Sequence, residues 1–166
     1  MLTTEIRIGN LVKFCGDNNF EVIFPVSDIS HNSVVYSHFL ENELPIDKIQ
    51  PIRLNTEWVK KFGFERGTKS IFGNEFFIKT PSKTNANQVI RKFRLWEADN
   101  NYLLDLEQFG YGDELKIEIN HVHLLQNVYF FLTGEKLNIN DRYLQGLREQ
   151  YKISVPNKDC DQIYSK

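Results

Sequence analysis

The sequence contains few of the residues that cross-link small proteins. Of its 166 residues only two are cysteines, Cys15 and Cys160, near opposite ends of the chain, and no CxxC pair occurs. Such a chain offers no disulfide framework, and we expect both cysteines to be free thiols in a reducing cytoplasm. A domain of this length buries roughly 70% of its unfolded surface, so it needs neither a disulfide nor a metal to fold.

Long hydrophobic runs and a strong excess of one charge are also missing. No window approaches the ~20 apolar residues of a membrane span. The start, MLTTEIRIGN, lacks the basic residues and the apolar run of a signal peptide. A net charge of −2 gives no general attraction to nucleic acid or to an anionic membrane, which leaves only a local basic patch. We therefore expect a cytoplasmic protein with no membrane partner.

Several motifs that identify enzymes are absent. The sequence has no phosphate-binding loop, no dinucleotide fingerprint, no nucleophile elbow and no HExxH zinc motif. The two glycines of Gly110-Tyr111-Gly112 indicate a turn. We therefore expect no cofactor, no metal and no catalytic activity.

Residues 1–54 carry short alternating apolar stretches separated by turn signals. The stretch 6–14 alternates around a bend at Gly9-Asn10, and 20–29 and 33–40 have the same character. Pro25 predicts that its strand lies at a sheet edge, because proline cannot donate a ladder hydrogen bond. Three or four short strands with tight links predict a small SH3-like β subdomain over residues 1–54.

The periodicity changes after residue 54. Asn55 or Thr56 can cap a helix near 56–62, and Gly63 can end it. Trp58, Val59 and Phe62 share one face of that helix and are expected in the core. Apolar stretches then predict an antiparallel sheet. Its strands are expected at 64–80, 89–99, 101–109 and 114–120.

A longer helix is predicted at 121–133, with Asn120 as its N-cap and Gly134 as its end. Its apolar residues fall at helical spacing on one broad face. They are Leu124, Leu125, Val128, Phe131 and Leu132. Residues 55–137 would thus form an α+β core, and 138–166 a partly helical or loose tail, with Gly146 interrupting any helix there.

Three stretches resemble a family of small uncharacterised proteins encoded by Bacteroidetes bacteria, their phages and their mobile elements. These are IRIGNLV, PIRLNTEWVKKFGF and HVHLLQNVYFFLTGEKL. The chain departs from the family pattern at Leu124 and Phe131 and in the tail after residue 137. The resemblance implies a mobile-element context but transfers no biochemical function. The matching positions are Arg7, Gly9, Asn10, Trp58, Phe62, Gly63, His123, Gln126, Asn127, Tyr129, Thr133 and Gly134.

Four residues of the longer helix form a stripe at spacings i, i+3, i+4 and i+7, beside the apolar face. They are His123, Gln126, Asn127 and Phe130. One interpretation is structural, with the polar side chains bonding the backbone of a loop packed on the helix. The other is a contact surface for a protein partner, in which His123 would be pH-sensitive.

His121 and His123 also raise the question of a metal. Residues at i and i+2 share a face on a strand, but point roughly 200° apart on a helix. This pair falls at a strand-to-helix junction, and no further ligand motif accompanies it. We therefore expect no metal here.

A basic and aromatic strand is the candidate nucleic-acid surface. Arg91, Lys92 and Arg94 lie near Trp96, and positions 92, 94 and 96 would share one face. Cations with an aromatic platform can hold a phosphate backbone and stack on bases. The alternative is a solvated charge face, with Asp105 and Glu107 pairing these cations across the sheet.

A metal-dependent nuclease is a distant alternative. Asp105, followed by Glu114 and Lys116 across a hairpin, resembles the spacing of carboxylates that hold Mg²⁺ beside a lysine that positions water. Alternating charge on the open face of a sheet produces the same spacing. The sequence as a whole favours a non-enzymatic accessory or interaction protein, of phage or mobile-element origin, that binds a macromolecular partner.

Overall fold

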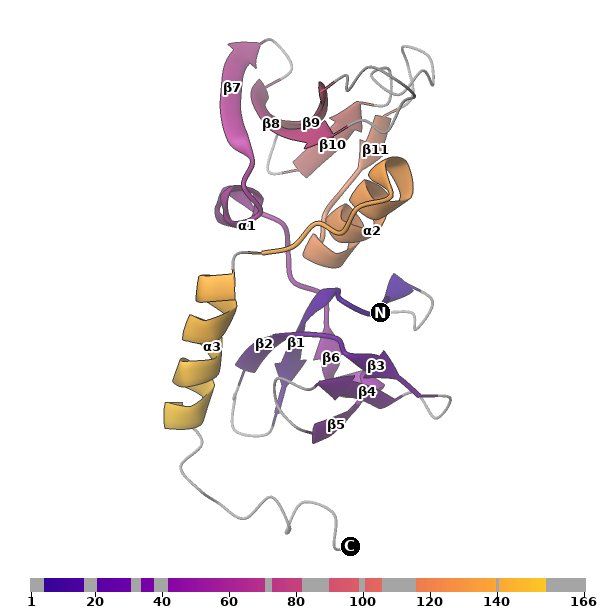
Figure 1. Cartoon of the computed structure of the whole chain (residues 1–166), viewed down its shortest axis with the longest axis vertical. Coiled ribbons are helices and arrows are strands. Elements are labelled where there is room, and N and C mark those ends of the chain that lie inside the picture. The colour runs from indigo at the N-terminus through magenta and orange to yellow at the C-terminus, as the bar shows by residue number, and fades with distance from the viewer. Residues whose placement is uncertain are drawn as a thin grey trace, which may run out of the picture.

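The computed structural model has an α+β fold in which all strand pairs are antiparallel, as predicted (Figure 1). In this view α1 (Thr56–Lys61) and α2 (Val122–Thr133) lie below the larger sheet, whereas α3 (Asp141–Ser154) lies lower, beside β2 of the N-terminal part. The structure describes residues 5–16, 21–30, 34–37, 42–70, 73–81, 90–98, 101–105, 116–139 and 141–154.

The N-terminal part contains two small sheets, ordered β2-β1-β6 and β3-β4-β5. Pro25 lies in β2 at the edge of its sheet, opposite Leu11, so the prediction of an edge position is confirmed. The likeness to SH3 domains stays a prediction. The elements are β1 (Leu11–Cys15), β2 (Glu21–Pro25), β3 (Asp28–Ile29), β4 (Val34–Ser37), β5 (Asn42–Pro45), the 3-10 helix η3 (Ile46–Lys48) and β6 (Ile49–Gln50).

The second part is a five-stranded sheet, ordered β11-β10-β9-β8-β7, with helices α1 and α2, and the chain then continues into α3, which contacts β2 of the N-terminal part. Its apolar side chains alternate along the strands, so that Phe93 and Leu95 of β9 are buried and Arg94 between them is exposed. The elements are α1 (Thr56–Lys61), β7 (Glu65–Ser70), β8 (Gly73–Pro81), β9 (Ile90–Ala98), β10 (Asn101–Asp105), β11 (Lys116–Glu118), α2 (Val122–Thr133) and α3 (Asp141–Ser154).

Local signals account for α1. The Asn55 side chain caps the helix by accepting a hydrogen bond from the Trp58 amide at 3.0 Å. After α1 the chain turns at Gly63, whose φ of 85° lies in the left-handed region. Trp58 and Phe62 are buried in the larger of two apolar clusters, as expected. That cluster also contains Leu11 from β1, so the two parts share core contacts.

Helix α2 is rotated relative to the prediction. Leu125 is buried and Val128 and Leu132 pack against the core, but Phe131 is 79% exposed. The inward side of α2 instead includes Gln126. The predicted cap was also wrong, because the N-cap is His121 rather than Asn120; its extended backbone forms a bridge with Arg53 and its side chain makes no capping bond. Gly134 ends the helix in the left-handed conformation, as predicted.

Helix α3 continues through Gly146, where an interruption was expected. Its Tyr143 meets the Trp58 ring edge-on, with ring centres 5.9 Å apart. Lys61 lies over both rings, and its Nζ donates to the Tyr143 hydroxyl at 3.0 Å. A single glycine costs a helix about 1 kcal/mol, which this packing offsets.

Candidate functional site

The candidate site starts with a tight turn at Arg7–Asn10. The Asn10 amide donates to the Arg7 carbonyl at 3.0 Å, and Gly9 at the third position has a φ of 93°. A positive φ at that position is typical of a type II turn and favours glycine. The Asn10 side chain also accepts a hydrogen bond from the Arg7 amide at 2.8 Å. This turn leaves the Ile8 side chain 58% exposed.

Gln126 of α2 bonds the backbone of this turn with both the oxygen and the nitrogen of its side-chain amide. Its Oε1 accepts from the Leu11 amide at 2.8 Å, and its Nε2 donates to the Gly9 carbonyl at 3.2 Å. The same Nε2 donates to the Leu137 carbonyl at 3.2 Å. Gln126 is only 8% exposed, so these bonds satisfy backbone groups that are shielded from water.

Asn127 continues the same contact one residue further along α2. Its Oδ1 accepts from the Asn10 Nδ2 at 3.0 Å, and its Nδ2 donates to the Glu5 carbonyl at 2.8 Å. We call Asn10, Gln126 and Asn127 the amide clasp. Gln126 and Asn127 thus bond the backbone of a segment packed on α2, as the structural interpretation of the stripe predicts.

Phe130 completes the site at the surface. The Arg7 guanidinium carbon lies 4.8 Å from the centre of the Phe130 ring, within cation–π range, and the Phe130 side chain is 37% exposed. Between the turn and α2 lies a hollow of about 90 Å³, which we call the turn pocket. Its lining residues are Arg7, Ile8, Gly9, Asn10, Gln126, Asn127, Phe130, Lys136, Leu137 and Asn138.

His123 does not take part in this surface. Its side chain is 1% exposed, and neither ring nitrogen has a hydrogen-bond partner among the described residues. Burial, with a smaller effect of the His121 charge, lowers the pKa of His123 to about 4, so the ring is neutral near pH 7. A buried neutral imidazole offers nothing to a partner, which corrects the idea of His123 as a pH-sensitive contact. Its ring stacks on that of His121, with centres 5.7 Å apart.

The basic and aromatic strand is β9. Arg94 is exposed, and its Nε lies 3.5 Å from a carboxylate oxygen of Glu75 on the neighbouring strand β8, while the expected pairing with Asp105 or Glu107 stays a prediction. Trp96 is half-buried, and the register sets Lys92 opposite Lys79. The side chains of Arg91, Lys92 and Asp105 lie outside the part of the structure that is described, as does Glu107 altogether.

The three side chains of the nuclease hypothesis lie outside the described part of the structure, so this hypothesis stays a prediction. Asp105 and Lys116 are register partners of β10 and β11, but their side chains and the whole of Glu114 lie outside the described part. Among the residues that are described, no three His, Cys, Asp or Glu side chains gather in a group that could hold a metal ion.

A carboxylate that the sequence did not single out organises the joint between α1 and the sheet. Glu97 Oε1 accepts from Thr56 Oγ1 at 2.6 Å and from the Tyr102 hydroxyl at 2.7 Å, and its Oε2 accepts from Asn74 at 2.9 Å. Burial alone would raise the pKa of Glu97, but these hydrogen bonds outweigh it and hold the pKa below its usual value. Every oxygen is used internally, so this carboxylate serves the packing of α1. No local pattern could have revealed it, because its hydrogen-bond partners come from two separate strands, β8 and β10, and from helix α1.

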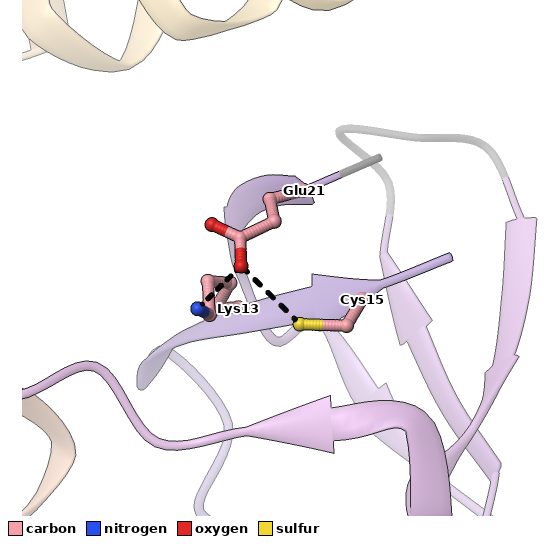
Figure 2. A network of polar contacts seen from close by, with 3 residues as sticks. All are labelled: Lys13, Cys15 and Glu21. Atoms are coloured by element: carbon pink, nitrogen blue, oxygen red, sulfur yellow. Dashed lines mark hydrogen bonds and ion pairs between the residues drawn. The ribbon is translucent and has the colours of Figure 1, made fainter. Parts of the chain in front are cut away.

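A smaller polar group lies on β1 and β2 (Figure 2). Lys13 Nζ is 2.8 Å from Glu21 Oε1, and the Cys15 thiol donates to the same oxygen at 3.8 Å. The hydrogen bond from Lys13 lowers the pKa of Glu21. Cys15 carries a free thiol, as predicted, and Cys160 lies outside the described residues.

Comparison with protein-family models, with curated proteins and with solved structures gives no match. The resemblance to the Bacteroidetes and phage family therefore stays a prediction. No helix within the described ranges is long and apolar enough to cross a membrane.

Proposed function

We propose that the chain is a non-enzymatic interaction protein that binds a protein partner at the turn pocket. The observation that carries this proposal is the position of Ile8 and Phe130, two exposed apolar side chains on the wall of one small hollow. As the family resemblance implies, it would be an accessory protein of a phage or mobile element.

The surroundings of these two side chains favour binding. The amide clasp fixes the backbone of the turn to α2, so Ile8 and Phe130 are held in place before a partner arrives. A pre-organised surface loses less conformational entropy on binding. Arg7, stacked on Phe130, adds a residue type that is enriched at the centres of protein interfaces.

The test is affinity capture from an extract of the native host, with the wild-type chain compared with Phe130→Ala and Ile8→Ser. We expect both variants to lose a specific protein that the wild type retains. The matched control is Phe131→Ala, because Phe131 is more exposed than its neighbour Phe130 but does not line the turn pocket. A partner retained by Phe130→Ala and Ile8→Ser would place the interface elsewhere and contradict the proposal.

Nucleic-acid binding by β9 is the second candidate function. The observation in its favour is a row of basic positions across β8 and β9. Lys79 and Lys92 are opposite each other in the strand register, and Arg94 and then Trp96 follow at alternate positions along β9, on the same face. If this face binds a phosphate backbone, affinity for single-stranded DNA falls steeply with salt and weakens in Arg94→Glu.

Glu75 sharpens this second test. It now pairs with Arg94, so Glu75→Gln should raise DNA affinity if Arg94 contacts phosphate, whereas Lys60→Glu on the exposed side of α1 should leave it unchanged. Absence of DNA binding at low salt would end this candidate.

A further inference from the structure

We infer that the turn pocket selects an acidic segment of its protein partner, in which an aliphatic side chain enters between Ile8 and Phe130 and a neighbouring carboxylate meets Arg7 and Lys136. This inference rests on the proposed function and adds the chemical class of the ligand. It follows from three features of the lining: which polar groups are already used, which charges remain, and how large the hollow is.

The three amides of the clasp have little left to offer a ligand, which leaves Asn138 as the one lining amide that forms no side-chain hydrogen bond to the described residues. Gln126 uses its oxygen and its nitrogen on three backbone groups, and Asn10 and Asn127 bond to each other and to backbone at Arg7 and Glu5. A ligand that needed these amides would have to break the clasp that holds the turn. Recognition therefore falls mainly to the apolar walls and to the charged groups, with Asn138 at the rim as a further polar contact.

Both charged residues in the lining are cations, Arg7 and Lys136. Neither forms an ion pair with any residue in the described part of the chain, although Glu5 and Glu135 are close in sequence and do not line the pocket. Arg7 is also held over the Phe130 ring, which directs its guanidinium to the same wall. A carboxylate is the complementary group, and an arginine fork suits it.

The size of the hollow sets the apolar part of the ligand. A closed cavity of roughly 150 Å³ accepts a benzene ring, whereas the turn pocket is open to solvent on one side and holds about 90 Å³. A small branched aliphatic side chain such as valine or leucine matches this space better than an aromatic one. The ligand is thus an acidic residue beside an aliphatic residue, presented on an extended segment.

The experiment uses the full chain and three pools of fluorescent eight-residue peptides on a glycine-serine background. One pool carries aspartate beside leucine or valine, the second has lysine in place of aspartate, and the third has serine in place of the aliphatic residue. Fluorescence anisotropy should show the first pool binding at least about tenfold more tightly than the other two.

Charge reversal provides the decisive variant. Lys136 is exposed and makes no hydrogen bond in the described part of the structure, so Lys136→Glu should fold normally and shift preference toward the lysine pool. Arg7→Gln should weaken binding of the aspartate pool by about tenfold. The matched control, Lys60→Glu on α1, should change neither preference.

Three outcomes would overturn the inference: equal binding of the aspartate and lysine pools, unchanged preference in Lys136→Glu, or no binding of the aspartate pool at about 1 mM, the limit of weak recognition. If a host protein were nevertheless captured in a manner that depends on Phe130, the proposed function would hold and only the acidic ligand class would be rejected. Light scattering that showed dimers lost in Phe130→Ala would make a second copy the occupant, and would also overturn the inference.

Discussion

The first and second helical turns of α2 each bury a polar side chain, but the two side chains differ in whether their polar atoms find hydrogen-bond partners. In the first, the His123 ring is enclosed and neither nitrogen finds a partner among the described residues. In the second, Gln126 is almost as deeply enclosed but bonds three backbone groups. The same stripe of the sequence therefore contains one side chain that stabilises the fold and one whose burial costs stability.

This difference shows that burial alone does not give the role of a polar residue. A buried amide that completes the hydrogen bonds of a turn replaces the water those groups would otherwise need. A buried imidazole without partners loses its hydration and gains only packing. Four substitutions or conditions test the contrast, from the largest expected effect to the smallest.

Gln126→Ala should lower the free energy of unfolding by about 3 kcal/mol, because it leaves the buried Leu11 amide, the buried Leu137 carbonyl and the part-buried Gly9 carbonyl without this partner. Urea unfolding followed by circular dichroism measures this loss. The matched control is Gln145→Ala on the exposed side of α3, which should change stability by less than about 0.5 kcal/mol. Equal effects at the two positions would show that the clasp contributes nothing.

Acidification from pH 6.5 to pH 4 should remove about 3 kcal/mol of stability through His123. Its pKa is about 4 in the folded protein and 6.5 as a free side chain, so in this window the unfolded chain binds a proton that the native chain does not. Above pH 6.5 the ring is neutral in both states and its protonation costs the fold nothing. As the pH falls from 6.5 toward 4, protonation of the unfolded chain progressively lowers the free energy of unfolding. Urea midpoints across this range measure it.

Glu97 titrates at lower pH than His123 does in the unfolded chain, because its pKa is held below 4.5 in the folded protein; the stability it contributes is present above pH 4.5 and is lost as the pH falls through its lowered pKa. The His123→Leu variant separates the two effects, because it should flatten the profile between pH 6.5 and 5. A slope that persists in this variant would assign the pH dependence to another group.

At pH 7.5 the same His123→Leu substitution should raise the free energy of unfolding by about 1 to 2 kcal/mol, since it replaces an unpaired polar ring with an apolar side chain of similar volume. Thermal melting gives a convenient readout. His121→Leu, next to it and only half-buried, serves as the comparison and should shift the midpoint little. A destabilised His123→Leu would indicate that the ring has a partner after all.

Asn127→Ala should cost about 1 kcal/mol, because it removes two hydrogen bonds from a side chain that is only partly buried. The same exchange at exposed Asn138 should be neutral, and the difference between the two melting temperatures measures the bond to the turn. A loss as large as that of Gln126→Ala would contradict the ranking of the clasp residues by burial.

The sequence predicted best where the signals are local. Asn55 and Gly63 bound α1 within eight residues, and Gly134 ends α2 in the conformation that a C-terminal glycine favours. The α+β class and the edge position of Pro25 follow from alternation and from the missing amide of proline. None of these features requires knowledge of which distant segments meet.

The prediction was wrong where distant groups decide the outcome. The apolar pattern predicts an inward Phe131, which is exposed in the structure. The structural interpretation of the stripe predicts that Gln126 bonds the backbone of a packed loop, and it does, but only the fold identifies that backbone as the Arg7–Asn10 turn and its neighbours. Gly146 was expected to interrupt a helix, but packing of Tyr143 on Trp58 holds α3 together.

The hydrogen bond between Leu11 and Gln126 joins residues 115 positions apart in the chain. On the ribosome, at 5–20 residues per second, about ten seconds separate the synthesis of these two residues. During that interval β1 can already pair with β2 and β6, but the Gln126 side chain that accepts a hydrogen bond from the Leu11 amide has not been synthesised. We therefore expect the Leu11 end of β1 to gain this last hydrogen bond only after α2 has been synthesised.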